Sequence, residues 1–173
     1  MKQLLLLGIA IILFTACTKQ EKRYTQQSLE IDTYKKVIEA YEKQDWNAMA
    51  GHYADTAKIL NNVTIKEAQT VAQLINQNKE EATLFSSWKY DPKSVEYEMV
   101  ITDKGETWVN FWGHWEANLK SNGKLYIIPA HMTARFIEGK VVREDGYWDI
   151  SKLMMDIQQM EATKNISEEI KEN

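Results

Sequence analysis

The chain has 173 residues, and 44% of them are hydrophobic, which is enough apolar side chain for one globular core. Its formal net charge of −4 provides no basic surface, and this argues against a nucleic-acid partner. The single cysteine excludes an intrachain disulfide.

Residues 1–16 have the pattern of a cleaved export signal. Lys2 supplies a positive charge, and the apolar run Leu4–Phe14 follows it. This run is too short for a helix that crosses a bilayer, so cleavage after export is the better interpretation. The junction at Ala16-Cys17 resembles a bacterial lipoprotein signal, which implies that Cys17 carries a lipid. The alternative is an ordinary signal peptide followed by a free thiol.

A lipid on Cys17 implies a place in the cell envelope, where the chain is anchored to a membrane and faces the periplasm or the outside. Residues 17–27 are polar and have no period, so they predict a flexible tether between the membrane and the domain. A folded domain is predicted over residues 28–160, and residues 161–173 form a charged, loose tail.

Two helices are predicted at the start of the domain. Ser28 is a suitable N-cap for the first, and Asp45 can cap a shorter second helix. The first helix has one apolar face at helical spacing, formed by Tyr34, Val37, Ile38 and Tyr41. The same spacing recurs in the second, in Trp46, Met49, Ala50 and Tyr53. Aromatic residues in such a stripe are typical of a core.

The middle of the chain is predicted to contain shorter elements. Ala57–Val63 predicts a short strand, and Thr64 with Glu67 fits a capping box that opens a third helix. Thr83–Tyr90 is interpreted as an apolar connector. Ser94–Thr102 alternates between apolar and acidic residues, which predicts a strand with one buried face.

The segment from Thr107 to Asp149 contains three longer strand-like runs, which are expected to pair antiparallel. They are Thr107–Leu119, Lys124–Ile137 and Lys140–Asp149. A turn is predicted at Lys120–Gly123, where Asn122-Gly123 is a signal for a two-residue hairpin, and Glu138-Gly139 predicts a tight connection after the second run. A helical stripe follows, formed by Ile150, Leu153, Met154 and Ile157.

This order of elements predicts an α+β fold with the helices gathered on one face of an antiparallel sheet. The order resembles the nuclear transport factor 2-like superfamily, and within it the SnoaL-like branch. The residues that carry the resemblance are EAYEKQDWNAMAGHYADTAKI in the first half and RFIEGKVVREDGYWD near the end. The resemblance implies a cone in which a curved antiparallel sheet wraps around about three helices and encloses a pocket.

The resemblance also suggests where an enzyme of this fold would place its acids and bases. The steroid isomerase branch has a general base on the first strand, at the position of Asn61, and a second carboxyl on the penultimate strand, at the position of Pro129. Neither an amide nor a proline takes a proton near neutral pH, so isomerase activity is not expected. SnoaL-type cyclases use a His and an Asp late in the chain, and His131 and Asp149 are the candidates here. The alternative is that Asp149 caps the next helix and His131 is a hydrogen-bonded wall residue.

Six residues are predicted to line a pocket for an unknown small molecule: Tyr34, Trp112, His114, His131, Arg135 and Trp148. On an unbroken strand His131 and Arg135 share one face, and Arg135 would pair with an acidic group of the ligand. No spacing of His, Cys, Asp or Glu matches a metal motif, and no Gly-rich loop is built to hold phosphate. Neither a metal nor a cofactor is therefore predicted.

Both faces of the run Trp108–Trp115 carry large side chains. A sheet with one face in water alternates more cleanly, so either Gly113 marks a bulge that resets the register or both faces are covered. Helices can cover one face, and a second subunit can cover the other, which predicts a homodimer. Pro129 predicts that the second long strand is interrupted or lies at an edge of the sheet.

Three functional hypotheses follow. The favoured one is an envelope-anchored lipoprotein that binds a small ligand in the cone without catalysis. The first alternative is an enzyme of the lyase, isomerase or cyclase kind that uses His131 and Asp149. The second is a structural subunit that dimerises through its sheet. Adjacent His131 and Asp149 side chains in an open pocket would favour the enzyme.

Overall fold

The computed structural model describes the backbone of residues 23–172 and the side chains up to residue 165. The predicted signal peptide, residues 1–16, and the predicted lipid attachment site, Cys17, lie outside the described residues. Within the described part, none of the helices combines the length and the apolar character needed to cross a membrane.

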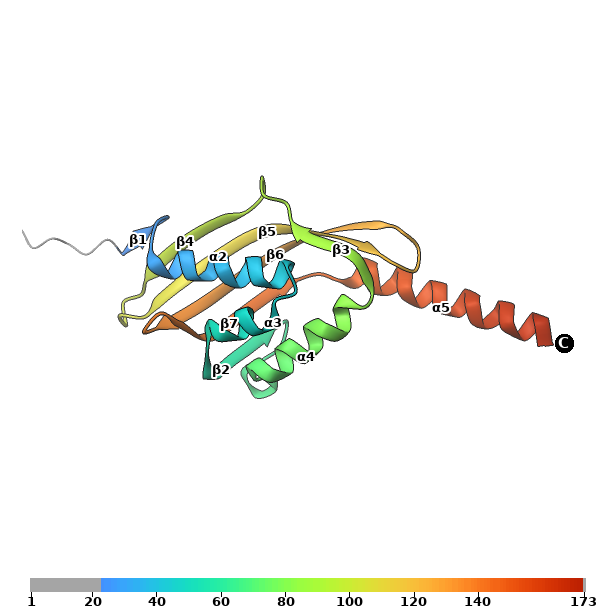
Figure 1. The fold of residues 1–173 in the computed structure, drawn as a ribbon, viewed down its shortest axis with the longest axis horizontal. Helices are drawn as coiled ribbons and strands as arrows, with labels where there is room; N and C mark the ends of the chain where they lie inside the picture. Colours follow the sequence, from blue (N-terminus) through green and yellow to red (C-terminus); the bar gives the residue numbers. More distant parts are fainter. Residues whose placement is uncertain (1–22, 173) are drawn as a thin grey trace, which may run out of the picture.

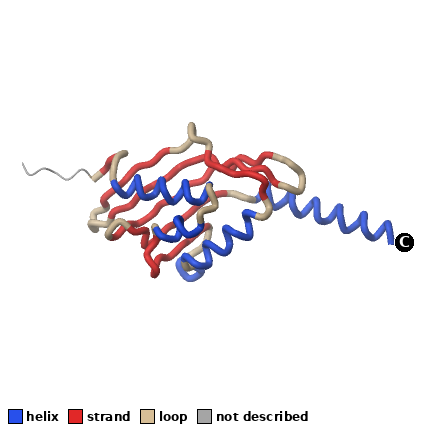
Figure 2. The backbone as a smooth tube through the Cα atoms, in the orientation of Figure 1, coloured by secondary structure: helices blue, strands red, loops and turns tan. Residues whose placement is uncertain are grey.

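Seven strands form one curved sheet, and α2 (Leu29–Glu42), α3 (Trp46–Gly51) and α4 (Val71–Ala82) lie against one of its faces (Figure 1, Figure 2). The strands are β1 (Tyr24–Thr25), β2 (Tyr53–Asn61), β3 (Phe85–Tyr90), β4 (Glu96–Ile101), β5 (Thr107–Leu119), β6 (Leu125–Ile137) and β7 (Lys140–Trp148). Their order is β1-β4-β5-β6-β7-β2, and β3 shares one edge of β5 with β4. All pairs are antiparallel except β2 with β7. The predicted α+β cone is confirmed.

The two predicted N-caps are confirmed, and they set where the first helices begin. The side chain of Ser28 accepts a 3.2 Å hydrogen bond from the amide of Ile31, and Asp45 accepts one of 3.0 Å from Ala48. Each bond satisfies an amide that the first turn of a helix leaves without a partner. The predicted apolar face of α2 packs against the inner face of the sheet, and Tyr34 is fully buried there.

Strands β5 and β6 pair without interruption from Thr107, opposite Phe136, to Asn118, opposite Leu125. The predicted break at Pro129 is therefore wrong. The ladder between β6 and β7 begins at Ala130, one residue beyond the proline. The missing amide hydrogen thus falls where β6 has a paired neighbour on one side only, which is why the strand tolerates a proline.

Several element boundaries differ from the sequence prediction. The capping box at Thr64 opens only a short 3-10 helix, η1 (Ile65–Glu67), and α4 begins at Val71 behind a second capping box formed by Thr70 and Gln73. The predicted short strand begins earlier, at Tyr53. The predicted connector before Tyr90 is strand β3, which pairs with β5.

The two ends of the described chain are also more ordered than predicted. The end of the predicted tether forms β1, which pairs with β4, and Arg23 makes a 2.7 Å ion pair with Asp103. The predicted tail continues helix α5, which runs over Ser151–Glu172. The sequence did not predict these two elements, because both segments are polar and neither has apolar residues at a helical or strand spacing.

The two predicted turns of the long strands behave differently. Glu138 and Gly139 have φ values of 50° and 74° and join Ile137 directly to Lys140, as a two-residue hairpin requires. The loop before Lys124 is longer, because the amide of Leu119 bonds to the carbonyl of Lys124 and leaves four residues between them. The predicted turn at Lys120–Gly123 is therefore confirmed in its position, and only the two-residue hairpin type indicated by Asn122-Gly123 is wrong.

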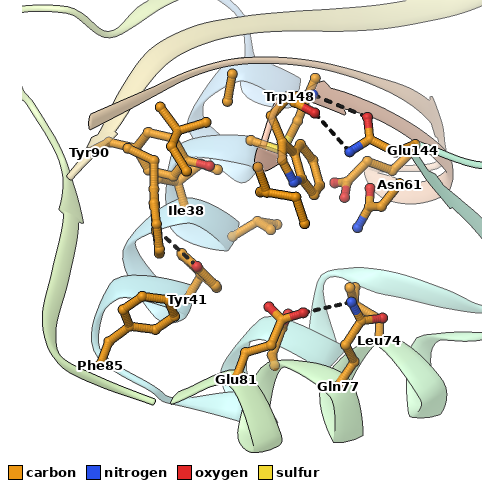
Figure 3. A pocket seen from close by; sticks show the side chains of 18 of the residues that line it. Ile38, Tyr41, Asn61, Leu74, Gln77, Glu81, Phe85, Tyr90, Glu144 and Trp148 are labelled. Atoms are coloured by element: carbon orange, nitrogen blue, oxygen red, sulfur yellow. Dashed lines mark hydrogen bonds between the residues drawn. The ribbon is translucent and has the colours of Figure 1, made fainter. Parts of the chain in front are cut away.

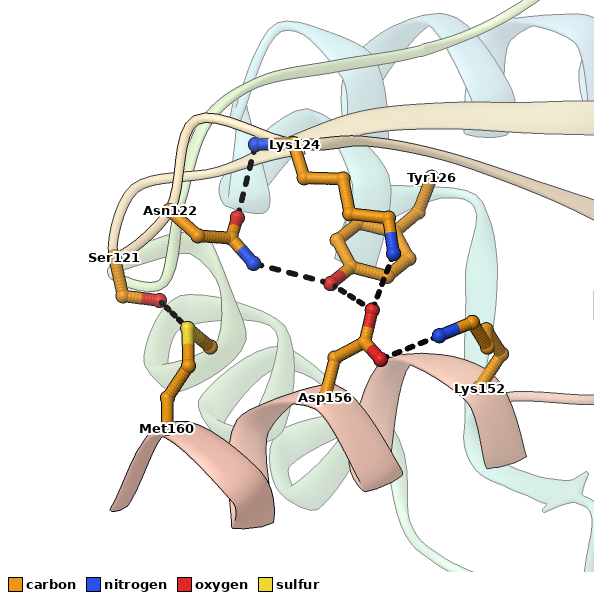
Figure 4. A network of polar contacts seen from close by, with 7 residues as sticks. All are labelled: Ser121, Asn122, Lys124, Tyr126, Lys152, Asp156 and Met160. Carbon is orange, nitrogen blue, oxygen red and sulfur yellow. Dashed lines mark hydrogen bonds and ion pairs between the residues drawn. The ribbon is translucent and has the colours of Figure 1, made fainter. Parts of the chain in front are cut away.

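Helix α5 is attached to the β5–β6 hairpin by a polar network centred on Asp156 (Figure 4). Its carboxylate accepts hydrogen bonds from the hydroxyl of Tyr126 (2.9 Å) and from the ammonium groups of Lys124 and Lys152 (2.5 Å each). These donors, led by Lys124, hold the pKa of Asp156 well below its usual range. Beneath the network, Leu153 is buried in a second apolar cluster with residues of β3, β5 and β6.

Candidate functional site

A cavity of about 440 Å³ lies between the inner face of the sheet and the helices. This volume is within the range of small-molecule sites. Helices α2 and α4 form one side of it, and the first turns of α5 border it. Its wall is mainly apolar and aromatic, with a few polar groups, as Figure 3 shows. Apolar wall residues come from every side, among them Ile38, Leu74, Phe85, Ile128, Met132 and Leu153.

The carboxyl group of Glu144 is the central polar group of this wall. Strand β7 places Glu144 opposite Ala134 on the inner face, and the residue is only 3% exposed. Its Oε2 atom accepts two hydrogen bonds, from the hydroxyl of Tyr34 at 2.8 Å and from that of Tyr53 at 2.9 Å. This buried carboxyl therefore links helix α2 and strand β2 to strand β7.

Burial raises the pKa of Glu144 above its ordinary value, since an ionised carboxylate loses its hydration there. The two tyrosine hydrogen bonds act in the opposite direction, and the negative charge of Asp145 adds to the effect of burial. The pKa values of Tyr34 and Tyr53 are also raised, first by burial and then by Glu144, so both hydroxyls keep their protons and donate. A neutral Glu144 can donate a hydrogen bond, and an ionised one can bind a cation.

Asn61 lies beside Glu144 on the same wall, because β2 pairs Asn61 with Gly146 and Ile59 with Glu144 (Figure 3). The Oδ1 atom of Asn61 is buried and, within the described part of the chain, has no hydrogen-bond partner. Gly146 makes room for it: a Cβ atom there would lie 2.6 Å from this oxygen and 2.5 Å from the ring of Trp148. An unpaired acceptor of this kind invites a donor from a ligand.

Trp148 is held over the cavity by its backbone. The side chain of Asn62 donates a 3.0 Å hydrogen bond to the carbonyl of Trp148 and accepts one of 3.2 Å from its amide (Figure 3). On the opposite wall the indole of Trp115 donates to the hydroxyl of Tyr41 at 3.1 Å. At the rim, Gln77 donates to the exposed Glu81 at 2.7 Å.

Only two of the six predicted pocket residues, Tyr34 and Trp148, line the cavity. Trp112, His114, His131 and Arg135 lie on the opposite, outer face of the sheet. Strand alternation explains why these four residues do not line the cavity. On β6, the buried residues are those with even numbers, including Ala130 and Met132, so His131 and Arg135 point away from the cone.

On the outer face three rings stack across three strands. His131 lies 4.9 Å from Trp112, with 27° between the ring planes, and 6.4 Å from Tyr147, with 12°. The Nδ1 atom of His131 is 3.0 Å from the carbonyl oxygen of Phe111. Arg135 is paired at 3.2 Å with Glu106. We call Trp112, His131 and Tyr147 the outer ring row.

Asp149 is not part of either arrangement. It accepts hydrogen bonds from the amide and the hydroxyl of Ser151, and these bonds lower the pKa of Asp149. The residue therefore closes the turn that leads into α5. Among the described residues no hydrogen bond or ion pair joins Asp149 to His131. The pair required by the enzyme hypothesis is not assembled.

The positions compared with the steroid isomerase branch separate in the same way. Asn61 lies on the cavity wall, as the resemblance implied. Pro129 is exposed on the outer face, so the corresponding carboxyl position was misplaced. The carboxyl in the cavity is Glu144, which the sequence analysis missed. The described residues hold no group of three or more His, Cys, Asp or Glu side chains that could bind a metal ion.

No family model and no curated protein matches the sequence. Solved structures do match the fold. A candidate SnoaL-like polyketide cyclase from Shewanella denitrificans has a TM-score of 0.59 at 14% identity, over 77% of this chain and 99% of that one. A nuclear transport factor 2-like protein of unknown function from Burkholderia pseudomallei also scores 0.59, at 12% identity, over 75% and 97%.

A third structure is a protein with a ketosteroid isomerase-like fold from Catenulispora acidiphila, in complex with trimethylamine. Its TM-score is 0.56 at 11% identity, over 69% of this chain and 87% of that one. At such low identity these likenesses establish the fold alone. The chain has the nuclear transport factor 2-like fold, and its structural neighbours are SnoaL-like and ketosteroid isomerase-like proteins.

Proposed function

We propose that the protein is an envelope-anchored lipoprotein that binds a small, largely apolar molecule in its cone and does not convert it. The observation that carries this proposal is the 440 Å³ cavity with its aromatic wall and its buried polar groups, Glu144 and Asn61. A mainly apolar pocket with a few polar groups is the usual form of a small-ligand site. A structural neighbour with a ketosteroid isomerase-like fold is in complex with a small molecule, trimethylamine, which is in keeping with a small-ligand function.

Binding without turnover is favoured by the state of the polar groups. Asn61 is an amide and cannot serve as a base near neutral pH. Glu144 already accepts two tyrosine hydrogen bonds through one oxygen, and His131 and Asp149 point elsewhere. A reaction would need a base within reach of a substrate proton and a donor for the charge that develops.

A ligand screen on the purified domain tests this proposal. Trp115 and Trp148 line the cavity, so their fluorescence reports on occupancy. We expect some compounds to change the emission and to be recovered chemically unchanged by mass spectrometry. Recovery of a converted compound, with conversion lost in a Glu144→Gln variant that still binds, would replace the binding function by an enzymatic one.

The membrane anchor is proposed from the sequence junction Ala16-Cys17 and needs its own test. Cys17→Ala removes the thiol that the lipid would modify. We expect the parent protein to partition with membranes after cell fractionation and the variant to be released or to remain unprocessed. A variant that is processed and membrane-bound like the parent would contradict the lipid assignment.

We also propose that the outer face pairs with a second copy of the chain. The outer ring row is open, with Trp112 38% and Tyr147 54% exposed. The same face has acidic residues on β4, Glu96 and Glu98, and arginines on β6 and β7, Arg135 and Arg143. A second copy rotated by 180° would set the acids of each subunit against the arginines of the other.

Sedimentation over a range of concentrations tests the dimer. Trp112→Asp places a charge in the outer ring row, and we expect it to leave the protein monomeric. Leu29→Asp is the control, since Leu29 is 82% exposed at the first turn of α2. A parent protein that stays monomeric at all concentrations would exclude this pairing.

A further inference from the structure

Among the described residues, the side chains of the cavity wall that can carry a charge near neutral pH are all acidic. Of the described residues that line the cavity, the only ionisable acids are Glu144 in the wall and Glu81 at the rim, and no Lys, Arg or His joins them. Arg143, next to Glu144 in the chain, points to the outer face and is held there by two 2.7 Å hydrogen bonds to Asp145. The cavity therefore offers a ligand no positive charge, and a cation bound beside Glu144 would favour the ionised form of this carboxyl against the effect of burial.

One buried hydrogen-bonding group beside Glu144 also favours a ligand that donates. The hydroxyls of Tyr34 and Tyr53 are both used on Oε2 of Glu144. The Oδ1 atom of Asn61, next to that carboxyl, is a buried acceptor without a donor among the described residues. A ligand that lacks an N–H or O–H group would leave this oxygen unpaired, which costs stability in an apolar site. An N–H group of a ligand would give this oxygen a partner.

Aromatic rings form much of the cavity wall. They come from four strands and one helix and comprise Tyr34, Tyr41, Tyr53, Phe85, Tyr90, Trp115 and Trp148. The faces of such rings carry negative charge density and attract organic cations, most strongly where water is excluded. The rings thus favour the same ligand charge as Glu144 does.

We propose that the ligand is a lipophilic amine bound as its ammonium ion, with the nitrogen at Glu144 and Asn61 and the apolar part against the aromatic wall. The ammonium charge faces the carboxylate of Glu144, and an N–H group donates to Oδ1 of Asn61. This inference rests on the proposed function, since it names the ligand class of the same cavity. A carboxylate ligand would meet like charge, and a hydrocarbon would leave Asn61 without a partner.

A matched series of three compounds tests the ligand class. 4-Phenylbutylamine, 4-phenylbutanol and 4-phenylbutyrate share one apolar part and differ in their terminal group, which is cationic, neutral or anionic. Their dissociation constants are measured on the parent protein by tryptophan fluorescence and by calorimetry. We expect the amine to bind at least about tenfold more tightly than the alcohol, which is the effect of one favourable charge contact, and the carboxylate to bind most weakly.

Two variants locate the effect. Glu144→Gln should remove most of the preference for the amine and leave binding of the alcohol within about twofold, because the apolar wall is unchanged. Glu80→Gln is the matched control, since Glu80 is exposed on α4 and does not line the cavity. It should keep the amine preference. The ranking on the parent protein decides the proposal even if Glu144→Gln unfolds the domain.

The outcomes separate the ligand class from the proposed function. If the alcohol or the carboxylate binds as tightly as the amine, the amine assignment is wrong and the binding function stands. If an amine preference is present but persists unchanged in a folded Glu144→Gln variant, the cation does not sit at Glu144 and the proposal is overturned. If none of the three compounds binds at millimolar concentration, the amine assignment and the proposed use of the cavity both fail.

Discussion

Tyr34 and Glu144 are 110 residues apart in the sequence, and a 2.8 Å hydrogen bond joins the hydroxyl of one to the carboxyl of the other. Tyr53 completes the arrangement from β2 at 2.9 Å. One carboxyl therefore ties together the first helix, the first long strand and the penultimate element of the fold. The same group is one of the few polar groups of the cavity wall, so it links the packing of the fold to the proposed ligand site.

Titration of Glu144 should make folding depend on pH. Its pKa in the unfolded chain is near 4.5, and burial raises the pKa in the fold. The stability contributed by the protonated form is thus fully present below pH 4.5 and is lost as the pH rises through the folded-state pKa. The neighbouring groups Tyr34, Tyr53 and Tyr90 have raised pKa values and keep their protons over this range. The negative charge of Asp145 raises the pKa of Glu144 further.

Glu144→Gln removes this titration. Relative to the variant, the parent protein should lose free energy of unfolding as the pH is raised above about 4.5, by at most about 1.4 kcal/mol per pH unit. Urea denaturation at a series of pH values measures the difference between the two proteins. A difference that stays constant from pH 4 to pH 8 would contradict the burial of an ionisable carboxyl.

Gly146→Ala should destabilise the fold and disturb the cavity wall. The added Cβ atom would lie 2.5 Å from the ring of Trp148 and 2.6 Å from Asn61, so both must move, at a cost of about 1–3 kcal/mol. Gly51→Ala is the control, because a Cβ atom there meets nothing within 4 Å. Denaturant midpoints compare the two variants, and equal midpoints would show that the wall at Gly146 is not tightly packed.

Thr70→Ala should lower the free energy of unfolding by about 0.5–2 kcal/mol, because Thr70 caps α4 and forms a capping box with Gln73. Thr64→Ala should cost less, since the element behind Thr64 is the three-residue η1. Thermal melts of the two variants measure which substitution lowers the stability more. A larger loss for Thr64 would mean that the first capping box, and not the second, limits the stability of this region.

Ligand binding should not depend on His131 or Asp149. The double variant His131→Ala, Asp149→Asn is expected to bind cavity ligands like the parent protein, because neither side chain lines the cavity. Trp148→Ala should weaken binding by about tenfold, the effect of removing one aromatic contact. Titration by calorimetry tests both. A loss of binding in the double variant would restore the predicted role of His131.

The site could be predicted only where the sequence showed which alternate residues of a strand face the interior. Trp148 was predicted as a pocket residue, and residues two and four positions before it share its face of β7. Those residues are Gly146 and Glu144, so the buried carboxyl could have been found from Trp148 alone. On β6 both phases contain apolar residues, and the choice of His131 and Arg135 for the inner face had no independent support.

The short elements were predicted less well for a different reason. In β3 the residues Trp88 and Tyr90 face the interior and Lys89 faces out, but a register shift near Phe85 breaks the alternation after only a few residues. β1 is shorter still and is fixed by pairing with β4. Such strands depend on their neighbours in the sheet, which local sequence patterns do not encode.

β1 and α5 lie at opposite ends of the long strands (Figure 1). β1 is joined through β4 to the end of β5 at Thr107, whereas α5 is bound to the hairpin beyond Leu119, and the 13 residues of β5 span about 40 Å. With Cys17 in a bilayer, the five residues before Arg23 reach at most about 20 Å. If Cys17 is lipidated as proposed, this length keeps the β1 end of the domain within about 20 Å of the membrane surface, while the end that carries α5 and borders the cavity can lie about one strand length farther away.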